Sequence, residues 1–197
     1  MLFRSAASRR PFPDLSQGVF HLLVTGGSQG ARVMSDIVPD ALAALSADLR
    51  QRLNVVQQAR EEDLSRVKEI YARAGIMSEV SPFFNDLPAR IANAHFVISR
   101  AGASTVSELA VIGRPAMLVP LPHALDQDQA ANAAFLTQAG AAETVRQNDF
   151  TQTFLTQRLA ELIEKPDSLI QRAYAAREVG VADAAERLAE LVIGLAI

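Results

Sequence analysis

The stretch that decides the fold runs from residue 21 to residue 32: His21-Leu22-Leu23-Val24-Thr25-Gly26-Gly27-Ser28-Gln29-Gly30-Ala31-Arg32. It opens with a short, nearly continuous apolar run, which is typical of a strand buried on both faces. Glycines and a serine follow, and residues 30–45 then carry apolar residues at helical spacing. A strand, a glycine-containing turn and a helix in this order predict the first βα unit of a parallel sheet.

The rest of the chain repeats this alternation. We expect helices at residues 30–45, 61–74, 87–94, 106–112, 128–139, 154–164, 168–179 and 182–195, and strands at residues 21–25, 53–57, 78–82, 96–99, 117–120 and 143–145. The pattern predicts an α/β domain with a doubly wound, parallel sheet of about six strands and a helical C-terminal tail. We assign residues 18–197 to this domain and residues 1–17 to an N-terminal extension or the remnant of an interdomain linker.

Composition narrows the class of protein. The chain has 197 residues, of which 49% are hydrophobic, so it can bury a sizeable core. A net charge of -3 and the absence of a polybasic run give no general attraction to nucleic acid. There is no cysteine, which excludes disulfides and thiolate metal sites and fits a cytoplasmic protein.

Residues 108–125 are interrupted by glycine, arginine and prolines, whereas a membrane-spanning helix needs about 20 apolar residues. Residues 1–10 lack the apolar region of a signal peptide.

Ligands of doubly wound sheets bind outside the carboxyl ends of the strands, so the loops there are the candidate site. The first is the loop Gly26–Arg32 itself. Glycines let the backbone approach a ligand, and the N–H groups of the following helix favour an anion such as phosphate. A tight turn with Ser28 as the helix cap explains the same residues. The loop is neither G-x-G-x-x-G nor a Walker loop.

The second loop, Ser99-Arg100-Ala101-Gly102-Ala103-Ser104-Thr105-Val106-Ser107-Glu108, places another helix start at the same edge. Two positive helix ends suit a diphosphate without a metal. Glu108 could accept hydrogen bonds from a ribose diol, because a carboxylate is a pure acceptor. The spacing Thr105-x-x-Glu108 equally fits a capping box, in which the glutamate only ties back the helix start.

The third loop runs from Pro120 to Gln129 and collects polar side chains that can read sugar hydroxyls. Asp126-Gln127-Asp128 matches an Asp-x-Asp pattern that can hold a divalent ion. Two acids before a helix are more often dipole partners, and no third ligand is apparent, so we expect neither a metal nor a cofactor. Of the three histidines, His21 and His95 are expected to be structural. His123 could be a base by location, but no acid is spaced to support it, so we expect no catalytic residue in this chain.

The runs Gly26–Arg32, Arg100–Glu108 and Gln129-x-x-Asn132-Ala133 occur in this order, followed by Gly140-Ala141-Ala142. Together they resemble the C-terminal, donor-binding domain of the MurG family of GT-B glycosyltransferases, from about residue 20 to the end. Members transfer N-acetylglucosamine from UDP-N-acetylglucosamine to lipid I, giving lipid II in peptidoglycan synthesis. The resemblance implies a Rossmann-like half of a GT-B fold.

The resemblance also implies roles for individual residues. Ser28 would contact the diphosphate within the loop, Phe84 lies where the family's backbone pairs with uracil, Glu108 would hold the ribose hydroxyls and Gln129 would read the sugar. Arg4 matches the arginine of an Asn-Pro-Val-Arg linker motif, although Met1-Leu2-Phe3 precede it here, and Asp128 stands where some members have glutamine or histidine. The full set expected to bind the donor is Arg4, Gly27, Ser28, Gln29, Gly30, Phe84, Arg100, Ala103, Ser104, Thr105, Glu108, Asp128 and Gln129.

The family's N-terminal domain, with its lipid I site, its proposed histidine base and its membrane-facing patch, has no counterpart in this sequence. We therefore expect the chain to bind UDP-N-acetylglucosamine without transferring it, and to insert no segment into a membrane. The whole family member would act on the cytoplasmic face of the inner membrane by an inverting displacement. Two alternatives remain open at this point: the donor-binding subunit of a split two-chain transferase, and a non-catalytic UDP-sugar-binding module.

Overall fold

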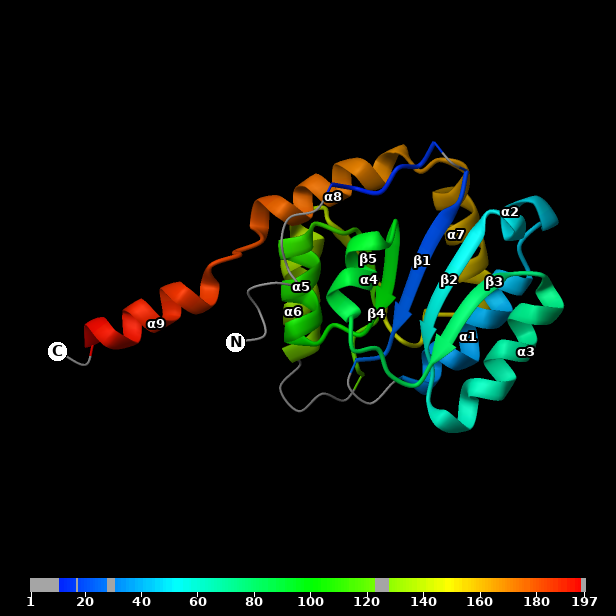
Figure 1. Ribbon diagram of the computed structural model, residues 1–197, viewed down its shortest axis with the longest axis horizontal. Helices are drawn as coiled ribbons and strands as arrows, with labels where there is room; N and C mark the ends of the chain where they lie inside the picture. Colours follow the sequence, from blue (N-terminus) through cyan, green and yellow to red (C-terminus); the bar gives the residue numbers. More distant parts are fainter. Residues whose placement is uncertain (1–10, 17, 28–30, 123–127, 196–197) are drawn as a thin grey trace.

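The structure is a computed structural model that describes residues 11–16, 18–27, 31–122 and 128–195. It contains a six-stranded sheet with the order β3-β2-β1-β4-β5-β6, in which every neighbouring pair is parallel (Figure 1). The strands are β1 (Phe20–Thr25), β2 (Leu53–Gln58), β3 (Met77–Ser81), β4 (Phe96–Ser99), β5 (Ala116–Leu118) and β6 (Ala142–Thr144). The predicted doubly wound parallel sheet of about six strands is confirmed.

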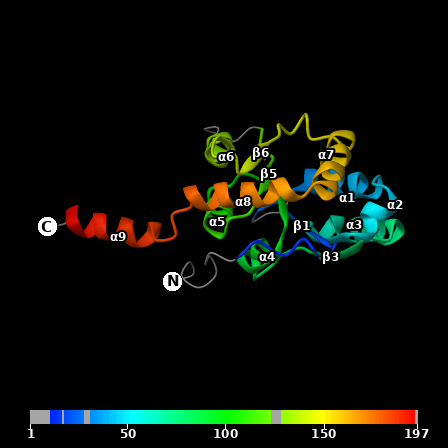
Figure 2. The ribbon, with the colours of Figure 1, turned by 90° about the horizontal axis from the view of Figure 1, so that it is seen from above.

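Helices cover both faces of this sheet (Figure 2). The helices are α1 (Arg32–Ala43), α2 (Ala47–Gln51), α3 (Leu64–Ala74), α4 (Leu87–Asn93), α5 (Ala103–Ile112), α6 (Asp128–Gln138), α7 (Gln152–Glu164), α8 (Asp167–Val179) and α9 (Ala184–Leu195), with a 3-10 turn at Glu61–Asp63. Side chains of α1, α2, α3 and α7 pack into one core, and side chains of α4, α5 and α6 pack into the other.

Strand β1 shows why the sequence builds two cores. Phe20, Leu22 and Val24 belong to one hydrophobic core and Leu23 belongs to the other. Successive residues of a strand point to opposite faces, so a continuous apolar run serves both helical layers. This confirms the expectation that β1 is buried on both sides. Helix α8 closes the domain by giving Leu169 to the first core and Ala176 to the second.

Several helix boundaries differ from the sequence prediction, among them those of α1 and α5. The helix expected at residues 30–45 is α1, which ends at Ala43, and a separate short helix α2 follows it. The side chain of Ser46 caps α2 by accepting a hydrogen bond from the Leu49 N–H. Helix α5 begins at Ala103 rather than at Val106, with Gly102 as its N-cap. This earlier start changes how the Thr105-x-x-Glu108 spacing in the second loop is interpreted.

The described part of the N-terminal segment lies against the domain. The Arg114 guanidinium, which is fully buried, donates a hydrogen bond to the Pro11 carbonyl at 2.7 Å. The Phe12 ring packs against the first core and lies 5.7 Å from the His95 ring, centroid to centroid. These contacts fix the direction from which the chain enters β1.

The C-terminal helix α9 projects away from the sheet and its covering helices (Figures 1 and 2). Its side chains Leu191, Val192 and Ile193 are exposed. Among the described residues, no helix is long and apolar enough to cross a membrane.

Candidate functional site

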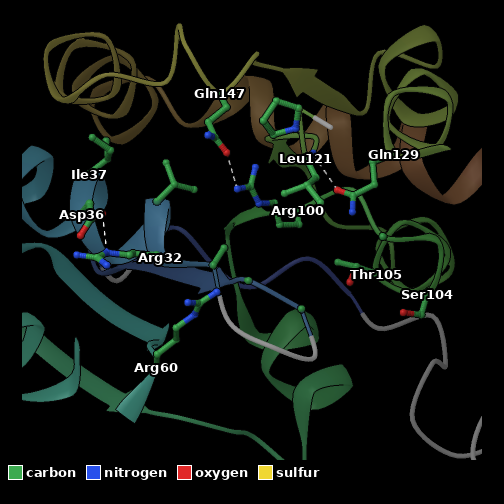
Figure 3. A pocket seen from close by; sticks show the side chains of 16 residues that line it. Arg32, Asp36, Ile37, Arg60, Arg100, Ser104, Thr105, Leu121, Gln129 and Gln147 are labelled. Atoms are coloured by element: carbon green, nitrogen blue, oxygen red, sulfur yellow. Dashed lines mark hydrogen bonds and ion pairs between the residues drawn. The ribbon is translucent and has the colours of Figure 1, made fainter. Parts of the chain in front are cut away.

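The main pocket lies at the carboxyl ends of β1, β4 and β5, where the strand order reverses between β1 and β4 (Figure 3). Its volume is about 770 Å³. Crevices at this point of a doubly wound sheet are where ligands bind. The lining residues come from the loops after β1, β2, β4, β5 and β6 and from α1, α5 and α6: Gly26, Gly27, Ala31, Arg32, Val33, Asp36, Ile37, Arg60, Arg100, Gly102, Ser104, Thr105, Leu121, Pro122, Gln129 and Gln147.

Two helices, α1 and α5, begin at this pocket, and among the described residues no capping side chain or first-turn acid compensates their free N–H groups. Their N-cap residues, Ala31 and Gly102, accept no side-chain capping bond, and neither helix has an acidic residue in its first turn. Helices α2 and α7 instead carry the capping side chains Ser46 and Thr151. Unsatisfied N–H groups and a positive helix dipole favour a bound anion. The two helix starts therefore form one anion-binding edge.

A smaller pocket of about 120 Å³ adjoins the first. Gly27, Ser104 and Thr105 line both pockets, so the two adjoin at the loop after β1 and the start of α5. The remaining lining residues are Gln58, Phe83, Phe84, Leu87 and Glu108. An extended ligand could place one end in the small pocket and the other in the large one.

Glu108 is the only carboxylate among the described residues of the small pocket. Partial burial raises the pKa of its carboxyl group, because desolvation disfavours the charged form. No hydrogen bond or ion pair joins Glu108 to another residue in the described part of the chain. A half-buried carboxylate of this kind is an acceptor ready for donors on a ligand.

The structure rejects the capping-box interpretation of Thr105-x-x-Glu108. Because Gly102 is the N-cap, Thr105 lies inside the first turn of α5 and Glu108 lies in the second turn. A capping box needs the threonine at the N-cap position. Glu108 therefore faces the small pocket and does not tie back the helix start.

Arg100 lines the pocket but is held largely by the protein. Its guanidinium donates to the carbonyls of Val119 and Pro120 at 3.1 and 3.2 Å and to Gln147 Oε1 at 2.6 Å. Partial burial lowers the pKa of Arg100. Arg100 thus joins the ends of β4 and β5 to the segment after β6. Gln147 was missed in the sequence because the loop after β6 carries no recognisable motif.

Gln58 was also missed, although it organises the first loop. It is buried, its Oε1 accepts from Thr25 Oγ1 at 2.9 Å and from the Gly26 N–H at 3.3 Å, and its Nε2 donates to the Pro82 carbonyl at 3.1 Å. Gln58 therefore fixes the loop after β1 to the loop after β3. The available signal was the pair of glutamines at the end of the strand, after the apolar residues Val55 and Val56.

The third loop places its two predicted residues differently. Gln129 lines the large pocket, and its Oε1 accepts from the Leu121 N–H at 3.1 Å. Asp128 is exposed and does not line the pocket, and its Oδ1 accepts from the N–H of Gln129 at 2.7 Å. Asp128 is therefore an acidic residue in the first turn of α6, where a carboxylate interacts favourably with the helix dipole. Its position does not support the expected contact with the sugar. Asn132 donates to the Ala101 carbonyl at 3.1 Å and ties α6 to the second loop.

The other predicted residues fall into three groups. Gly27, with a φ of +80°, and Ser104 and Thr105 lie on the pocket walls as expected. Ala103 is exposed and lines neither pocket, so only its backbone position at the start of α5 remains relevant. Arg4, Ser28, Gln29, Gly30, His123, Asp126 and Gln127 lie outside the described residues.

The side chain of Phe84 is buried and lines the small pocket. The Arg90 guanidinium lies 4.0 Å from the centre of its ring. The preceding residue, Phe83, is 60% exposed. The backbone at Phe84 is thereby held at the mouth of the small pocket by a well-packed ring.

His21 and His95 lie at the opposite end of the sheet from the pocket, where β1 and β4 begin. His95 Nδ1 accepts a hydrogen bond from the His21 N–H at 2.8 Å. Burial is the main cause that lowers the pKa of His95 to about 4, with the neighbouring His21 as a second cause. Among the residues that the structure describes, no group of three or more histidines and acids could hold a metal ion.

The sheet order and the pocket at its reversal define the class: a Rossmann-like α/β domain of the kind that forms one half of a GT-B glycosyltransferase. The chain belongs to the family described as the glycosyltransferase family 28 C-terminal domain, whose family model matches residues 21–188.

Known proteins are similar to this chain over nearly its whole length. The UDP-N-acetylglucosamine–N-acetylmuramyl-(pentapeptide) pyrophosphoryl-undecaprenol N-acetylglucosamine transferase of Methylobacterium sp. (strain 4-46) is 60% identical over 98% of this chain and 52% of its own length. The protein of the same name from Rhodopseudomonas palustris (strain BisB18) is 55% identical over 97% of this chain and 51% of its own length. The chain therefore spans about half the length of the curated relatives that it matches.

Solved structures agree. The crystal structure of MurG from Acinetobacter baumannii superimposes with a TM-score of 0.83 at 31% identity, covering 92% of this chain and 54% of that chain. The UDP-GlcNAc 2-epimerase of Neisseria meningitidis, solved with UDP-GlcNAc bound, has a TM-score of 0.59 at 12% identity. At that identity, the epimerase shares the fold alone. The expected half of a GT-B fold is confirmed.

Proposed function

We propose that this chain is the UDP-N-acetylglucosamine-binding half of the transferase that adds N-acetylglucosamine to lipid I to give lipid II. The observation that carries the proposal is the pair of helix starts, α1 and α5, at the large pocket, beside a small pocket whose Glu108 bonds to no other described residue. Membership of the glycosyltransferase family and the names of relatives at 55–60% identity support the same ligand.

The donor fits the two pockets from end to end. The uridine occupies the small pocket, with its base at the backbone of Phe84 and its ribose hydroxyls donating to Glu108. The diphosphate crosses the region shared by both pockets, at Gly27, Ser104 and Thr105. The N-acetylglucosamine then enters the large pocket beside Gln129, whose amide can bond to sugar hydroxyls.

The chemical contribution of this half is electrostatic. When the sugar leaves UDP, negative charge grows on the β-phosphate oxygen that carried it. Fixed N–H groups at the starts of α1 and α5 stabilise that charge without needing to reorganise. No metal is required for this role, because the helix ends and Arg100 already present positive potential to the diphosphate.

The base that deprotonates the acceptor hydroxyl belongs to the other half of the whole enzyme. The described carboxylates on the pocket walls are Asp36 and Glu108. Glu108 is assigned to the ribose, and Asp36 is already ion-paired with Arg66 at 2.8 Å. The chain alone therefore binds the donor without transferring the sugar. In the whole enzyme, which works at the cytoplasmic face of the membrane, the projecting helix α9 packs against the other half.

Calorimetric titration with UDP-N-acetylglucosamine, UDP-glucose and UDP tests the proposal. We expect saturable binding that prefers the N-acetylated donor, and no lipid II from the purified chain when lipid I is supplied. Tighter binding of UDP-glucose would contradict the assigned donor. Lipid II formed by the chain alone would contradict the assignment of the base to the other half.

A further inference from the structure

The large pocket extends well beyond the position proposed for the donor. Its far side is formed by the first turns of α1 and by the loop after β2, and it consists of Arg32, Val33, Asp36, Ile37 and Arg60, here called the α1 wall (Figure 3). None of these residues lines the small pocket. The donor, placed as above, uses backbone N–H groups at the start of α1 and leaves the side chains of the α1 wall unused.

Arg32 occupies a position that works against the stability of its own helix. It is the first residue of α1, where the dipole is positive and an acidic residue would be favourable. Its side chain is 71% exposed, so packing in the core does not explain its presence. A residue that breaks a local rule without serving the core is expected at a functional position. A cation beside a helix start adds to the attraction that the helix dipole has for an anion.

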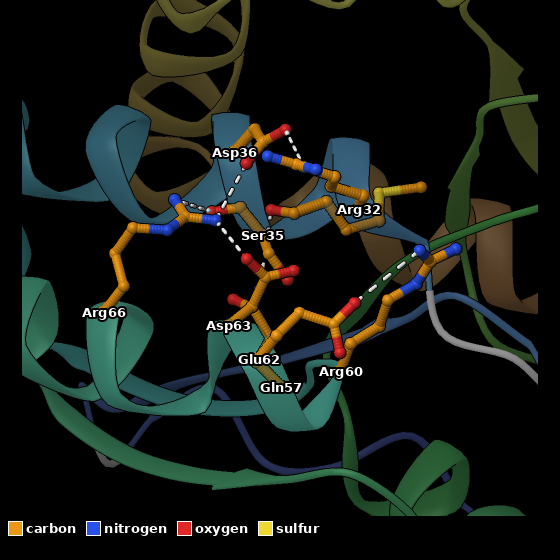
Figure 4. A network of polar contacts seen from close by, with 9 residues as sticks. Arg32, Ser35, Asp36, Gln57, Arg60, Glu62, Asp63 and Arg66 are labelled. Carbon is orange, nitrogen blue, oxygen red and sulfur yellow. Dashed lines mark hydrogen bonds and ion pairs between the residues drawn. The ribbon is translucent and has the colours of Figure 1, made fainter.

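A third arginine, Arg66, is paired with Asp36 of the α1 wall and with the neighbouring Asp63 (Figure 4). Arg66 lies 2.8 Å from Asp36 Oδ1 and 2.7 Å from Asp63 Oδ1. The ion pair between Arg32 and Asp36 is longer, at 3.5 Å, and Arg60 lies 3.9 Å from Glu62. Arg32 can therefore turn toward a ligand while Arg66 continues to balance Asp36.

We propose that the α1 wall is a second anion subsite, which binds a phosphate or carboxylate group of the acceptor while the donor is in place. This inference rests on the proposed function. The guanidinium groups of Arg32 and Arg60 match the paired oxygens of both anions. The relatives' names give their acceptor both a pyrophosphoryl group and a peptide, so both anions are available. Val33 and Ile37 supply the apolar surface beside them.

The test follows the side-chain Nε–H signals of arginine by nuclear magnetic resonance. The chain is first saturated with UDP-N-acetylglucosamine and then titrated with inorganic pyrophosphate or with succinate, at physiological salt. We expect saturable shifts of the Arg32 and Arg60 signals with at least one probe. The probe that binds more tightly identifies the source of the anion as the phosphate or the carboxylate end of the acceptor.

Matched variants separate a built subsite from general charge. The double variant Arg32→Gln, Arg60→Gln should weaken probe binding at least tenfold and change donor affinity less than twofold. Arg73→Gln removes an equally exposed arginine on α3, far from the pocket, and should change neither. Absence of saturable shifts at Arg32 and Arg60 in the donor-saturated chain would overturn the inference. A tenfold loss of donor affinity in the double variant would place these arginines in the donor site and would also overturn it. If the unaltered chain fails to bind the donor at all, the proposed function fails instead.

Discussion

The side-chain oxygen Oε1 of Gln129 accepts a hydrogen bond from the backbone N–H of Leu121 at 3.1 Å. This bond ties the start of α6 to the loop after β5, and both residues line the large pocket. Gln129 therefore has two tasks: its oxygen shapes the pocket, and its amide nitrogen remains as a donor for the ligand. Other side chains at the pocket also combine a contact to the protein with a proposed contact to the ligand.

Gln129→Glu separates these two tasks. A glutamate keeps an oxygen for the Leu121 N–H but loses the amide donor. We expect affinity for UDP-N-acetylglucosamine to fall about tenfold more than affinity for UDP, because the added charge acts on both ligands and the lost hydrogen bond only on the sugar. Calorimetry with both ligands measures the difference. An equal loss for UDP would show that Gln129 does not contact the sugar.

Glu108→Ala should weaken donor binding while leaving the fold intact. Loss of two hydrogen bonds from ribose to a carboxylate lowers affinity by about tenfold to about a hundredfold. Because burial raises the pKa of Glu108, its ionised form is disfavoured in the folded protein, and its removal should not lower the free energy of unfolding. Urea denaturation checks the second statement. Ser107→Ala, on the exposed neighbouring position, is the control and should bind the donor normally.

Arg100→Met should destabilise the domain because it leaves the acceptors at Val119, Pro120 and Gln147 without their shared donor. We expect the free energy of unfolding to fall by about 2 kcal/mol. Arg73→Met, whose side chain is 70% exposed, should change it by less than about 0.5 kcal/mol. Similar values for the two variants in urea denaturation would contradict the bridging role of Arg100.

His95 should make stability depend on pH. Its pKa is lowered from 6.5 to about 4 in the folded protein, so the unfolded chain binds more protons between these values. Stability is therefore complete above pH 6.5 and falls by about 2 kcal/mol as the pH drops toward 4. His95→Gln keeps an acceptor for the His21 N–H, so the stability of the variant should lack this fall, and the difference between the variant and the unaltered chain should show it. A His95 pKa near 6.5 by nuclear magnetic resonance would refute the prediction.

Helix α9 should contribute little to the stability of the rest of the chain. Its described side chains are exposed, whereas α8 supplies Leu169, Ala173 and Ala176 to the cores. A chain that ends at Gly180 should unfold with a free energy within about 1 kcal/mol of that of the longer chain. The donor affinity should also stay the same. A larger loss in urea denaturation would mean that α9 supports the domain.

The sequence by itself determined the fold and the location of the site. The apolar runs at β1, β4 and β5 require strands buried on both faces, and each is followed by small or polar residues and a helix. In a parallel sheet these loops must meet at one edge, whatever the details of packing. The order of motifs also indicated the family, because motifs and their order can be recognised in the sequence without knowledge of the structure.

The roles of individual residues depended on tertiary structure. The spacing in the sequence was equally compatible with Glu108 in a capping box and with Glu108 as a ligand-binding residue. The structure excludes the capping box, because α5 begins at Ala103, three residues earlier than expected. Gln58 and Gln147 act on loops that are distant in the chain, so no local pattern reveals them. Asp128 and Gln129 are adjacent in sequence, yet only Gln129 faces the pocket, because successive helix positions point in different directions. Local chemistry fixes what a side chain can do, and packing decides which group it meets.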